Sequence, residues 1–328
     1  MVAVGGGGVA LCGELLSMGR DREFVVPASV LSAFVTGNDV TREWASVLSS
    51  VAGDLLQEWK LRAEGAVRSG EAGVVVPVRR ADGTRAALKL QVPRAETTAA
   101  IIGLVRWNGR GIVRLLDSDR GRGAMLLERL HADRTLEVVE NDDDAVRVVG
   151  SLLARLHSAP APDGLPQLQT ILSGMLDDAP AAMTALERDD RARLRRWMSR
   201  VTDLEAEPGH HLLHWDLHYG NVLAADREPW LAIDPEPLVG DPGFDLWPAL
   251  DSGWSTDDTL TEAPRIVRRR FDILTEMLDL DRGRAAGWTV ARLLQNTLWD
   301  IEDGHAAIST SAKTVDDALA PFGGFRKG

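Results

Sequence analysis

Apolar residues follow two different patterns along the chain, and the change near residue 131 constrains the fold most strongly. Before this point, four strand-like runs predict two hairpins, the first of which turns through Asp82 and Gly83. These runs are residues 73–80, 85–90, 111–116 and 124–129. Helical spacing predicts helices over 40–59 and 96–107. The first part of the chain therefore predicts a small antiparallel sheet that carries a helix.

Beyond residue 131 the spacing of apolar residues is mainly helical. The predicted helices are residues 144–157, 181–204, 263–278 and 287–301. Between 211 and 245, short apolar strands alternate with polar loops. We expect an α+β chain of two lobes: a leader that is disordered at 1–23, a small antiparallel-sheet N-terminal lobe at 24–130, and a mainly helical C-terminal lobe at 131–328. A short hinge is expected near 128–131.

Charge and cysteine content limit which binding partners and which cellular compartment we expect. The 328 residues include 49 acidic and 37 basic ones, which gives a net charge of -12. This balance disfavours nucleic acid as a partner and suits a cationic ligand. No apolar run approaches the roughly 20 residues of a membrane span, and the single cysteine, Cys12, allows no disulfide within the chain. We expect a cytoplasmic monomer or weak dimer with no nucleic-acid or membrane partner.

The stretch HWDLHYGNVL at 214–223, followed by WLAID at 230–234, contains the groups needed for phosphoryl transfer to a hydroxyl. Asp216 and Asn221 have the spacing of a kinase catalytic loop, H-x-D-x-x-x-x-N. Asp216 is the candidate catalytic carboxylate, which orients the acceptor hydroxyl and takes its proton. Asn221 and Asp234 are the candidate Mg²⁺ ligands, since both offer oxygen atoms.

The N-terminal part offers candidates for contacts with a nucleotide. Lys89 lies in the middle of a predicted strand, and in this setting it is expected to contact the α and β phosphates. The segment RSGEAG at 68–73 precedes another strand. Gly70 and Gly73 would let its backbone N–H groups approach phosphate closely. The sequence thus predicts ATP and Mg²⁺ as cofactors.

From about residue 24 to 304 the chain resembles the aminoglycoside phosphotransferases, in particular their streptomycin 6-phosphotransferase and hydroxyurea-resistance branch. The phrases that carry the resemblance are VPVRRADGTRAALKLQ, LLHWDLHYGNVL, REPWLAIDPEPLVGDPGFDL and VARLLQNTLWDIEDG. The resemblance implies a protein-kinase-like fold with a five-stranded antiparallel sheet and a helix in the N-terminal lobe. It implies the same roles for Asp216, Asn221, Asp234 and Lys89, and adenine binding by the backbone of 128–130, including Glu128 and Leu130. It also implies that Asp245 braces the catalytic loop by hydrogen bonds.

Two positions depart from the pattern of this family. The helix of the N-terminal lobe usually offers a glutamate to the phosphate-binding lysine, but Ala100 occupies the position that aligns best. Glu96, one turn earlier on the same helix face, is the candidate substitute. Glu236 stands where the branch commonly has a lysine after the metal strand. Neither departure changes the three residues of the predicted catalytic core.

The acceptor pocket is expected to be built by C-terminal helices that face Asp216. Acidic and aromatic groups there would attract an acceptor that carries guanidinium or amine groups, by ion pairing and cation–π contact. The candidates are His218, Asp251, Trp254, Trp299, Asp300, Glu302 and Asp303. The expected activity is ATP-dependent O-phosphorylation of an aminoglycoside, with a streptomycin-like acceptor first.

Three other interpretations stay open at this point. The acceptor is another small molecule, such as an amino sugar or hydroxyurea. Alternatively, the chain is a catalytically weak nucleotide-binding protein of kinase fold, which the alanine at position 100 motivates. A metallohydrolase-type metal cluster is the third interpretation, and it would use the histidines His210, His211, His214 and His218.

Overall fold

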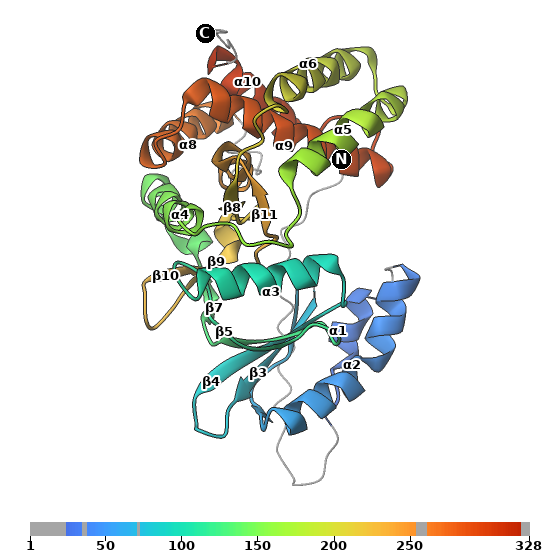
Figure 1. The fold of residues 1–328 in the computed structure, drawn as a ribbon, viewed down its shortest axis with the longest axis vertical. Coiled ribbons are helices and arrows are strands. Elements are labelled where there is room, and N and C mark those ends of the chain that lie inside the picture. Colours follow the sequence, from blue (N-terminus) through green and yellow to red (C-terminus); the bar gives the residue numbers. More distant parts are fainter. Residues whose placement is uncertain (1–23, 35–37, 71–72, 254–260, 323–328) are drawn as a thin grey trace. The chain divides into compact units, whose positions relative to one another are not determined.

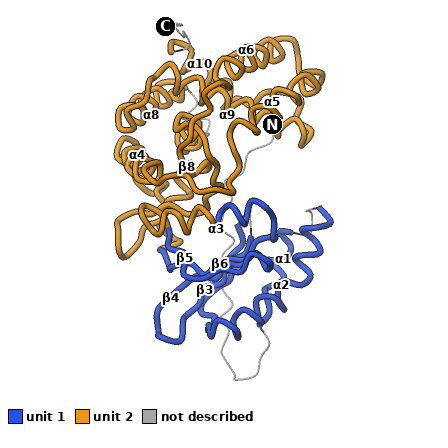
Figure 2. Tube along the Cα trace, viewed as in Figure 1, with its two compact units in different colours: residues 1–101, 113–130 blue, residues 102–112, 131–328 orange. Residues whose placement is uncertain are grey.

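The computed structural model describes residues 24–34, 38–70, 73–253 and 261–322. The chain divides into two compact units (Figure 2), one formed by residues 1–101 and 113–130 and the other by 102–112 and 131–328. The division at 130/131 falls within the expected hinge, whereas 102–112, expected in the N-terminal lobe, groups with the second unit. The predicted leader at 1–23 lies outside the described residues.

The first unit contains an antiparallel sheet of six strands in the order β1-β3-β4-β6-β5, with β2 paired to β3. The strands are β1 Arg62–Ala63, β2 Arg68–Gly70, β3 Gly73–Arg79, β4 Arg85–Gln91, β5 Leu115–Asp119 and β6 Ala124–Glu128. The predicted first hairpin is confirmed as β3 and β4. The sheet has one strand more than the family resemblance implied, because the short β1 and β2 pair with different parts of β3.

The start of the second predicted hairpin at residue 111 is wrong, since β5 begins at Leu115. Gly111 has a φ of +79°, outside strand geometry, and its carbonyl accepts a hydrogen bond from Ala232 N at 3.0 Å. Ile112 forms an isolated parallel bridge with Ala232. These residues are therefore committed to the second unit, and no local pattern reveals this.

Helix α2 (Asp39–Glu58) covers the apolar face of the sheet, and the prediction of a helix here is confirmed. Asn38 caps it by accepting a hydrogen bond from Thr41 N at 3.0 Å. The core of this unit combines apolar residues of α2 with alternate residues of β3 and β4, which point to one face of the sheet. Its fully buried members include Leu48, Ala52, Leu55, Val74, Val78, Ala86, Leu88 and Leu90.

Helix α3 (Ala95–Trp107) confirms the other predicted helix of this region, and the division between the units falls within it. The shorter elements of the first unit are α1 (Ala28–Leu31) and a 3-10 turn over Ser32–Phe34.

The second unit is mainly helical, as expected (Figure 1). Its helices are α4 (Asp142–His157), α5 (Leu168–Ala182), α6 (Arg188–Leu204), α7 (Trp247–Leu250), α8 (Ala263–Met277), α9 (Arg282–Glu302) and α10 (Thr310–Leu319). The predicted helix 181–204 starts too early, because an extended backbone at Leu186 and Glu187 separates α5 from α6. Helices α5 and α10 were not predicted.

Five short strands surround the loops that carry the predicted catalytic residues. Strands β10 (Trp230–Ala232), β9 (Val222–Ala224) and β7 (His131–Thr135) form one antiparallel sheet. Strands β8 (His211–Leu213) and β11 (Leu238–Gly240) form a second, two-stranded sheet. The loops 214–221 and 233–237 each run from one of these small sheets to the other. Within the described ranges, no helix is long and apolar enough to cross a membrane.

Candidate active site

Asp216 and Asn221 lie together in the loop that connects β8 to β9. Asn221 ends a 3-10 turn over Tyr219–Asn221 and is 8% exposed. Its side-chain Nδ2 donates to the backbone oxygen of Asp216 at 2.8 Å and to Oδ2 of the same residue at 3.1 Å. Since the amide nitrogen is used in this way, the amide oxygen is the atom left to bind a cation.

Asp234 follows β10 and is brought next to this loop by backbone hydrogen bonds. Ile233 N donates to the Asn221 carbonyl at 2.9 Å, and Glu236 N donates to the His214 carbonyl at 3.0 Å. The two bonds bracket Asp234, which adopts a left-handed φ of +53°. The structure therefore places all three residues of the predicted catalytic core on two adjoining loops of one unit.

Asp245 braces the same loop, in the way the family resemblance implied. It is fully buried, and its carboxylate accepts hydrogen bonds from His214 N at 2.9 Å, from Trp215 N and from the His157 ring at 2.9 Å. Burial opposes ionisation, but the hydrogen bonds from His157 and from the His214 backbone, together with the charge of His157, outweigh it, so the pKa of Asp245 lies below its ordinary value. An ionised carboxylate thus fixes the backbone directly before Asp216.

The four histidines of the metal-cluster interpretation do not converge on one site. His210 stacks on His211 at 4.7 Å between ring centroids, whereas the His214 ring bonds the Ile233 carbonyl at 3.0 Å. His218 Nδ1 accepts from Gly220 N at 3.1 Å. Burial lowers the pKa of His214 to about 4, so this ring is neutral at pH 7. In the part of the chain that the structure describes, no group of three or more His, Cys, Asp or Glu side chains is arranged to hold a metal.

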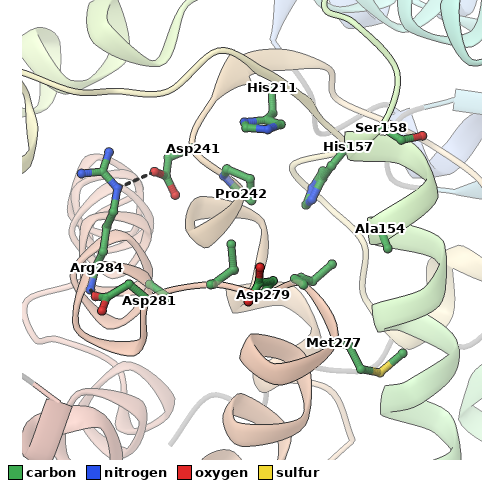
Figure 3. A pocket seen from close by; sticks show the side chains of 13 residues that line it. Ala154, His157, Ser158, His211, Asp241, Pro242, Met277, Asp279, Asp281 and Arg284 are labelled. Carbon is green, nitrogen blue, oxygen red and sulfur yellow. Dashed lines mark hydrogen bonds and ion pairs between the residues drawn. The ribbon is translucent and has the colours of Figure 1, made fainter.

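A pocket of about 530 Å³ lies beside His157 and His211 in the second unit (Figure 3). Asp241 and Arg284 contribute an ion pair to its wall, at 2.8 Å. The predicted catalytic residues are not among its lining residues. We therefore treat it as separate from the candidate active site.

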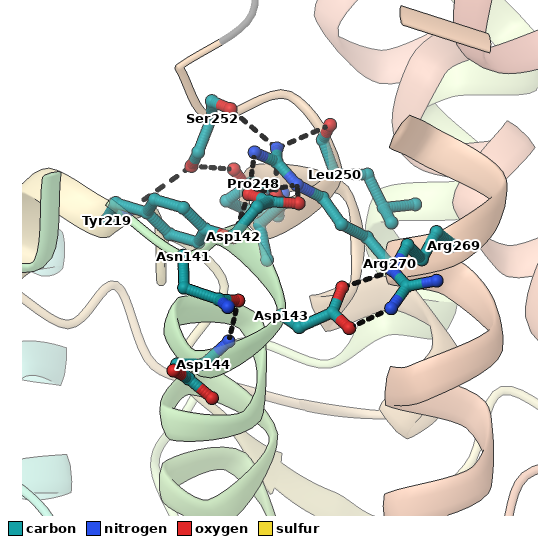
Figure 4. A network of polar contacts seen from close by, with 11 residues as sticks. Asn141, Asp142, Asp143, Asp144, Tyr219, Pro248, Leu250, Ser252, Arg269 and Arg270 are labelled. Carbon is teal, nitrogen blue, oxygen red and sulfur yellow. Dashed lines mark hydrogen bonds and ion pairs between the residues drawn. The ribbon is translucent and has the colours of Figure 1, made fainter. Parts of the chain in front are cut away.

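Arg270 of α8 holds the other side of the loop 214–221, the predicted catalytic loop (Figure 4). It is 3% exposed, pairs with Asp142 at the start of α4, and lies 5.0 Å from the ring centroid of Tyr219. Its Nη1 also donates to the backbone oxygens of Ala249 at 3.0 Å and Leu250 at 3.3 Å. This buried cation joins α4, α7, α8 and the loop before Asn221.

The candidate acceptor residues fall into three groups. His218 and Trp299 are partly exposed, and they lie next to Asp216 and to its neighbour Trp215: His218 Nε2 is 3.9 Å from Asp216 Oδ2, and the rings of Trp299 and Trp215 are 6.1 Å apart. The second group comprises four acidic residues that differ in exposure, and the third is Trp254 alone. Asp251 is largely buried, Asp300 is half-buried, Glu302 and Asp303 are exposed at the end of α9, and Trp254 lies outside the described residues.

Asp251 accepts a hydrogen bond from the Ser311 hydroxyl of α10. Burial raises the pKa of Asp251 to about 6, and the bond from Ser311 offsets only part of the effect. This carboxyl therefore sits in an unfavourable environment for its charge at neutral pH, which is a common property of functional groups.

Lys89 and the glycines belong to the first unit. Lys89 is 6% exposed in the centre of β4, between Val75 of β3 and Met125 of β6. A side chain on Gly73 would approach the Leu90 carbonyl to 2.2 Å, whereas nothing lies within 4 Å of the corresponding position on Gly70. Only Gly73 is therefore required as glycine by packing. The contact of Lys89 with phosphates stays a prediction.

The remaining nucleotide candidates also lie in the first unit. Glu128 ends β6 and accepts a hydrogen bond from Arg114 N at 2.7 Å through its side chain, and Leu130 is 9% exposed. Ala100 is 7% exposed on the buried face of α3, while Glu96 is exposed in its first turn. Adenine binding at 128–130 and the substitution by Glu96 stay predictions.

Sequence reasoning missed three residues that support the catalytic loop: His157, Arg270 and Arg292. Each is a polar residue within a helix that otherwise follows ordinary amphipathic spacing, and the residue through which it reaches the loop is far away in the sequence. The sequence could have identified them in one way: each is a polar residue at a position where the helical spacing predicts an apolar one. Such a residue needs a buried partner.

Comparisons with known proteins identify the family of this chain. Residues 58–304 match the model of a family described as aminoglycoside/hydroxyurea antibiotic resistance kinase. The chain is 61% identical over 286 residues to a streptomycin 6-kinase of Streptomyces griseus, which covers 87% of this chain and 93% of that relative. It is 45% identical to a hydroxyurea phosphotransferase of Kitasatospora aureofaciens, covering 90% of this chain and 85% of the other.

Solved structures of more distant proteins share the fold. A choline/ethanolamine kinase family protein from Mesorhizobium loti matches with a TM-score of 0.55 at 16% identity, over 86% of this chain and 93% of that one. A macrolide 2'-phosphotransferase from Brachybacterium faecium matches with a TM-score of 0.52 at 19% identity, over 82% and 97% respectively. These likenesses confirm the predicted protein-kinase-like fold.

Proposed function

This chain belongs to the aminoglycoside/hydroxyurea antibiotic resistance kinase family, and we propose that it transfers the γ-phosphoryl group of ATP to a hydroxyl of a streptomycin-like aminoglycoside. As a kinase it uses a nucleotide. The observation that carries the choice of acceptor is the likeness to the S. griseus streptomycin 6-kinase, which extends over nearly all of that relative. A likeness of this extent includes the C-terminal helices that would contact the acceptor.

In the proposed reaction Asp216 orients the acceptor hydroxyl. The hydroxyl oxygen bonds to the γ-phosphorus, the bond to the bridging oxygen of ADP breaks, and Asp216 takes the hydroxyl proton. No phosphoenzyme is formed. The bond from Asn221 Nδ2 to Asp216 Oδ2, 3.1 Å long, would hold one oxygen of the carboxylate and leave the other for the acceptor.

The Asn221 amide oxygen and the Asp234 carboxylate would hold Mg²⁺. The donor set fits, because both groups are oxygen ligands of the kind that a hard divalent cation prefers. When bound, Mg²⁺ neutralises the charge that develops on the β and γ phosphates. Lys89 would add a positive charge at the α and β phosphates. The backbone near Gly70 and Gly73 would donate N–H groups to them.

Adenine would be bound by the backbone of the segment 128–130 at the end of β6. A backbone site of this kind needs a fixed strand end, and the Glu128 N–H donates to the Arg114 carbonyl at 3.0 Å, which anchors that end. The side chain of Glu128 is likewise engaged with Arg114 N. The backbone N–H of Leu130 would donate to the base.

The acceptor side of the proposal uses the residues next to Asp216. Trp299 has 43% of its surface exposed and would stack against a cationic ring substituent. His218, whose Nε2 is 3.9 Å from Asp216 Oδ2, would lie near the acceptor hydroxyl that Asp216 orients. The acidic residues near the end of α9 and the net charge of -12 favour the approach of a polycationic acceptor.

Hydroxyurea is the second acceptor that the comparisons favour, because the 45% identity to a hydroxyurea phosphotransferase also spans most of both chains. It is a much smaller molecule and carries no cationic ring. It would use the Asp216 region without the aromatic and acidic residues of α9. Phosphorylation of a streptomycin-like acceptor would therefore depend on Trp299, whereas phosphorylation of hydroxyurea would not.

The experiment is a nucleotide-consumption assay with the purified full chain, Mg²⁺ and ATP or GTP. The acceptor panel contains streptomycin, other aminoglycosides, hydroxyurea and simple amino sugars, and each product is analysed by mass spectrometry. We expect a single added phosphoryl group on streptomycin. Consumption with hydroxyurea alone would favour the second acceptor, and nucleotide binding without transfer to any acceptor would refute the enzyme proposal.

A further inference from the structure

Trp215, the residue before Asp216, has an unusual backbone conformation. Its φ is +69°, in the left-handed region, where the Cβ of a bulky residue crowds the following carbonyl. Residues remain in such a conformation only when their surroundings hold them there. The peptide that joins Trp215 to Asp216 sets the direction of the catalytic carboxylate. Whatever holds Trp215 therefore also positions Asp216.

Two groups are in a position to hold Trp215. Its backbone N–H donates to Asp245, which fixes one end of the residue. Its indole ring is covered by the guanidinium of Arg292, whose central carbon lies 5.0 Å from the ring centroid. The same guanidinium is 5.9 Å from the ring of Phe244 and 5.4 Å from that of Trp299. Arg292 thus occupies a cage of three aromatic rings.

The surroundings of Arg292 are unusual for a buried arginine. It is 5% exposed in the middle of α9, and among the described residues no carboxylate forms an ion pair with it. Its Nη1 donates to the neutral Gln295 side chain at 3.1 Å, and its Nε has no hydrogen-bond partner. Burial lowers the pKa of Arg292 to about 10, so it stays a cation at neutral pH. The charges of Asp216, Glu236 and Asp245 and the three aromatic rings compensate for its lost hydration.

We propose that Arg292 is a positioning residue: by stacking on the Trp215 ring it holds that residue in its left-handed conformation and thereby fixes Asp216. The inference deepens the proposed function, since it requires that Asp216 takes part in phosphoryl transfer. On this proposal the three aromatic rings around Arg292 serve to position the loop and do not bind a ligand. Trp299 has a double role in this arrangement, because one face packs toward Arg292 and Trp215 while 43% of its surface stays exposed.

The first test removes the cation. Arg292→Met keeps an unbranched apolar stem about as far as the position of Nε and removes the charged guanidinium. We expect kcat to fall by about tenfold or more, equivalent to about 1.4 kcal/mol, with KM for ATP changed less than about twofold. Arg193→Met is the matched control, because Arg193 is a half-buried arginine that pairs with Asp316 between α6 and α10. It should lower thermal stability and leave kcat unchanged.

The second test asks whether Arg292 acts through the backbone of Trp215. Trp215→Gly and Trp215→Ala remove the same ring, but only glycine adopts the left-handed conformation without strain. We expect kcat of Trp215→Gly to exceed that of Trp215→Ala several-fold, and adding Arg292→Met to Trp215→Gly to have little further effect. Trp215→Asn, which also tolerates this conformation, repeats the comparison if the glycine variant does not fold.

Two results would overturn the proposal. Equal kcat values for the glycine and alanine variants would show that the conformation of Trp215 does not matter. A tenfold loss on adding Arg292→Met to the glycine variant would show that Arg292 acts on Asp216 directly. If the wild-type chain phosphorylates no acceptor, the proposed function fails instead. Thermal unfolding then tests the contact, because Arg292→Met must lower the Tm less in the glycine background than in the wild type.

Discussion

The environment of Asp251 predicts that replacing its carboxyl by an amide stabilises the protein at neutral pH. Burial is the main cause of the raised pKa, and the Ser311 hydroxyl and the charge of Arg270 act against it. An asparagine side chain has nearly the same shape and keeps an oxygen that accepts the bond from Ser311. Asp251→Asn therefore removes the cost of a buried charge without removing the contact to α10.

The magnitude follows from the linkage between ionisation and folding. A rise of the pKa from 3.8 to about 6 corresponds to about 3 kcal/mol of destabilisation when the group is fully ionised. Because the pKa of Asp251 is higher in the folded state, the folded state binds the proton more tightly than the unfolded state does. Ionisation of Asp251 therefore lowers the free energy of unfolding. The cost is absent below about pH 4, grows between pH 4 and 6, and is complete above about pH 6. We expect a gain of about 1–3 kcal/mol for Asp251→Asn at pH 7.5.

The assay is urea unfolding of the wild type and Asp251→Asn between pH 4.5 and 8. The difference between the two free energies of unfolding should be smallest at pH 4.5, at about a third of its final value, and should increase to a plateau above pH 6. Asp178→Asn on the exposed face of α5 is the control and should track the wild type. A variant that is less stable than the wild type at every pH, or a difference that does not change with pH, would refute the reasoning.

Three further predictions concern the two units separately. Asp216→Ala should lower phosphoryl transfer by about 10²–10⁴-fold while nucleotide binding survives; single-turnover kinetics and nucleotide titration check this, and full activity would exclude the assigned role. Gly73→Ala should destabilise the first unit by about 1–3 kcal/mol, since its Cβ would meet backbone at 2.2 Å, whereas Gly70→Ala should be nearly neutral in thermal unfolding. Asp142→Asn should cost about 1–3 kcal/mol, because it removes the charge that pairs with the buried Arg270; an unchanged Tm would contradict this.

The sequence was sufficient where local patterns determine the structure. The hairpin around Gly83 follows from β-branched runs on both sides of an Asp-Gly turn, and helix α2 follows from its apolar spacing. The spacing of Asp216, Asn221 and Asp234 also predicted that they would lie on neighbouring loops. These residues are close together in the sequence, and two short strands bring the loops into contact.

The failures occurred where distant residues decide the structure. Residues 111–114 have the composition of a strand, but Gly111 and Ile112 pair with Ala232, more than a hundred positions later, and so belong to the second unit. Helix α5 contains Pro180 and several small residues, which lower its helical signal, yet its apolar face packs in the second unit. Arg270 pairs with Asp142, and Arg292 lies over the rings of Trp215 and Phe244, all many positions away, so no local pattern identifies these contacts.

Contacts between residues far apart in the sequence also hold the catalytic loop in place. Its backbone is held by Asp245 after β11, its Tyr219 ring by Arg270 of α8, and its Trp215 ring by Arg292 of α9. Each of these groups is buried, and each comes from a segment that follows the loop in the chain. The loop cannot be ordered by its own sequence, since Trp215 adopts a conformation that is locally unfavourable. The catalytic geometry is therefore a property of the whole helical unit, which predicts that truncation before α9 abolishes transfer even though Asp216, Asn221 and Asp234 are retained.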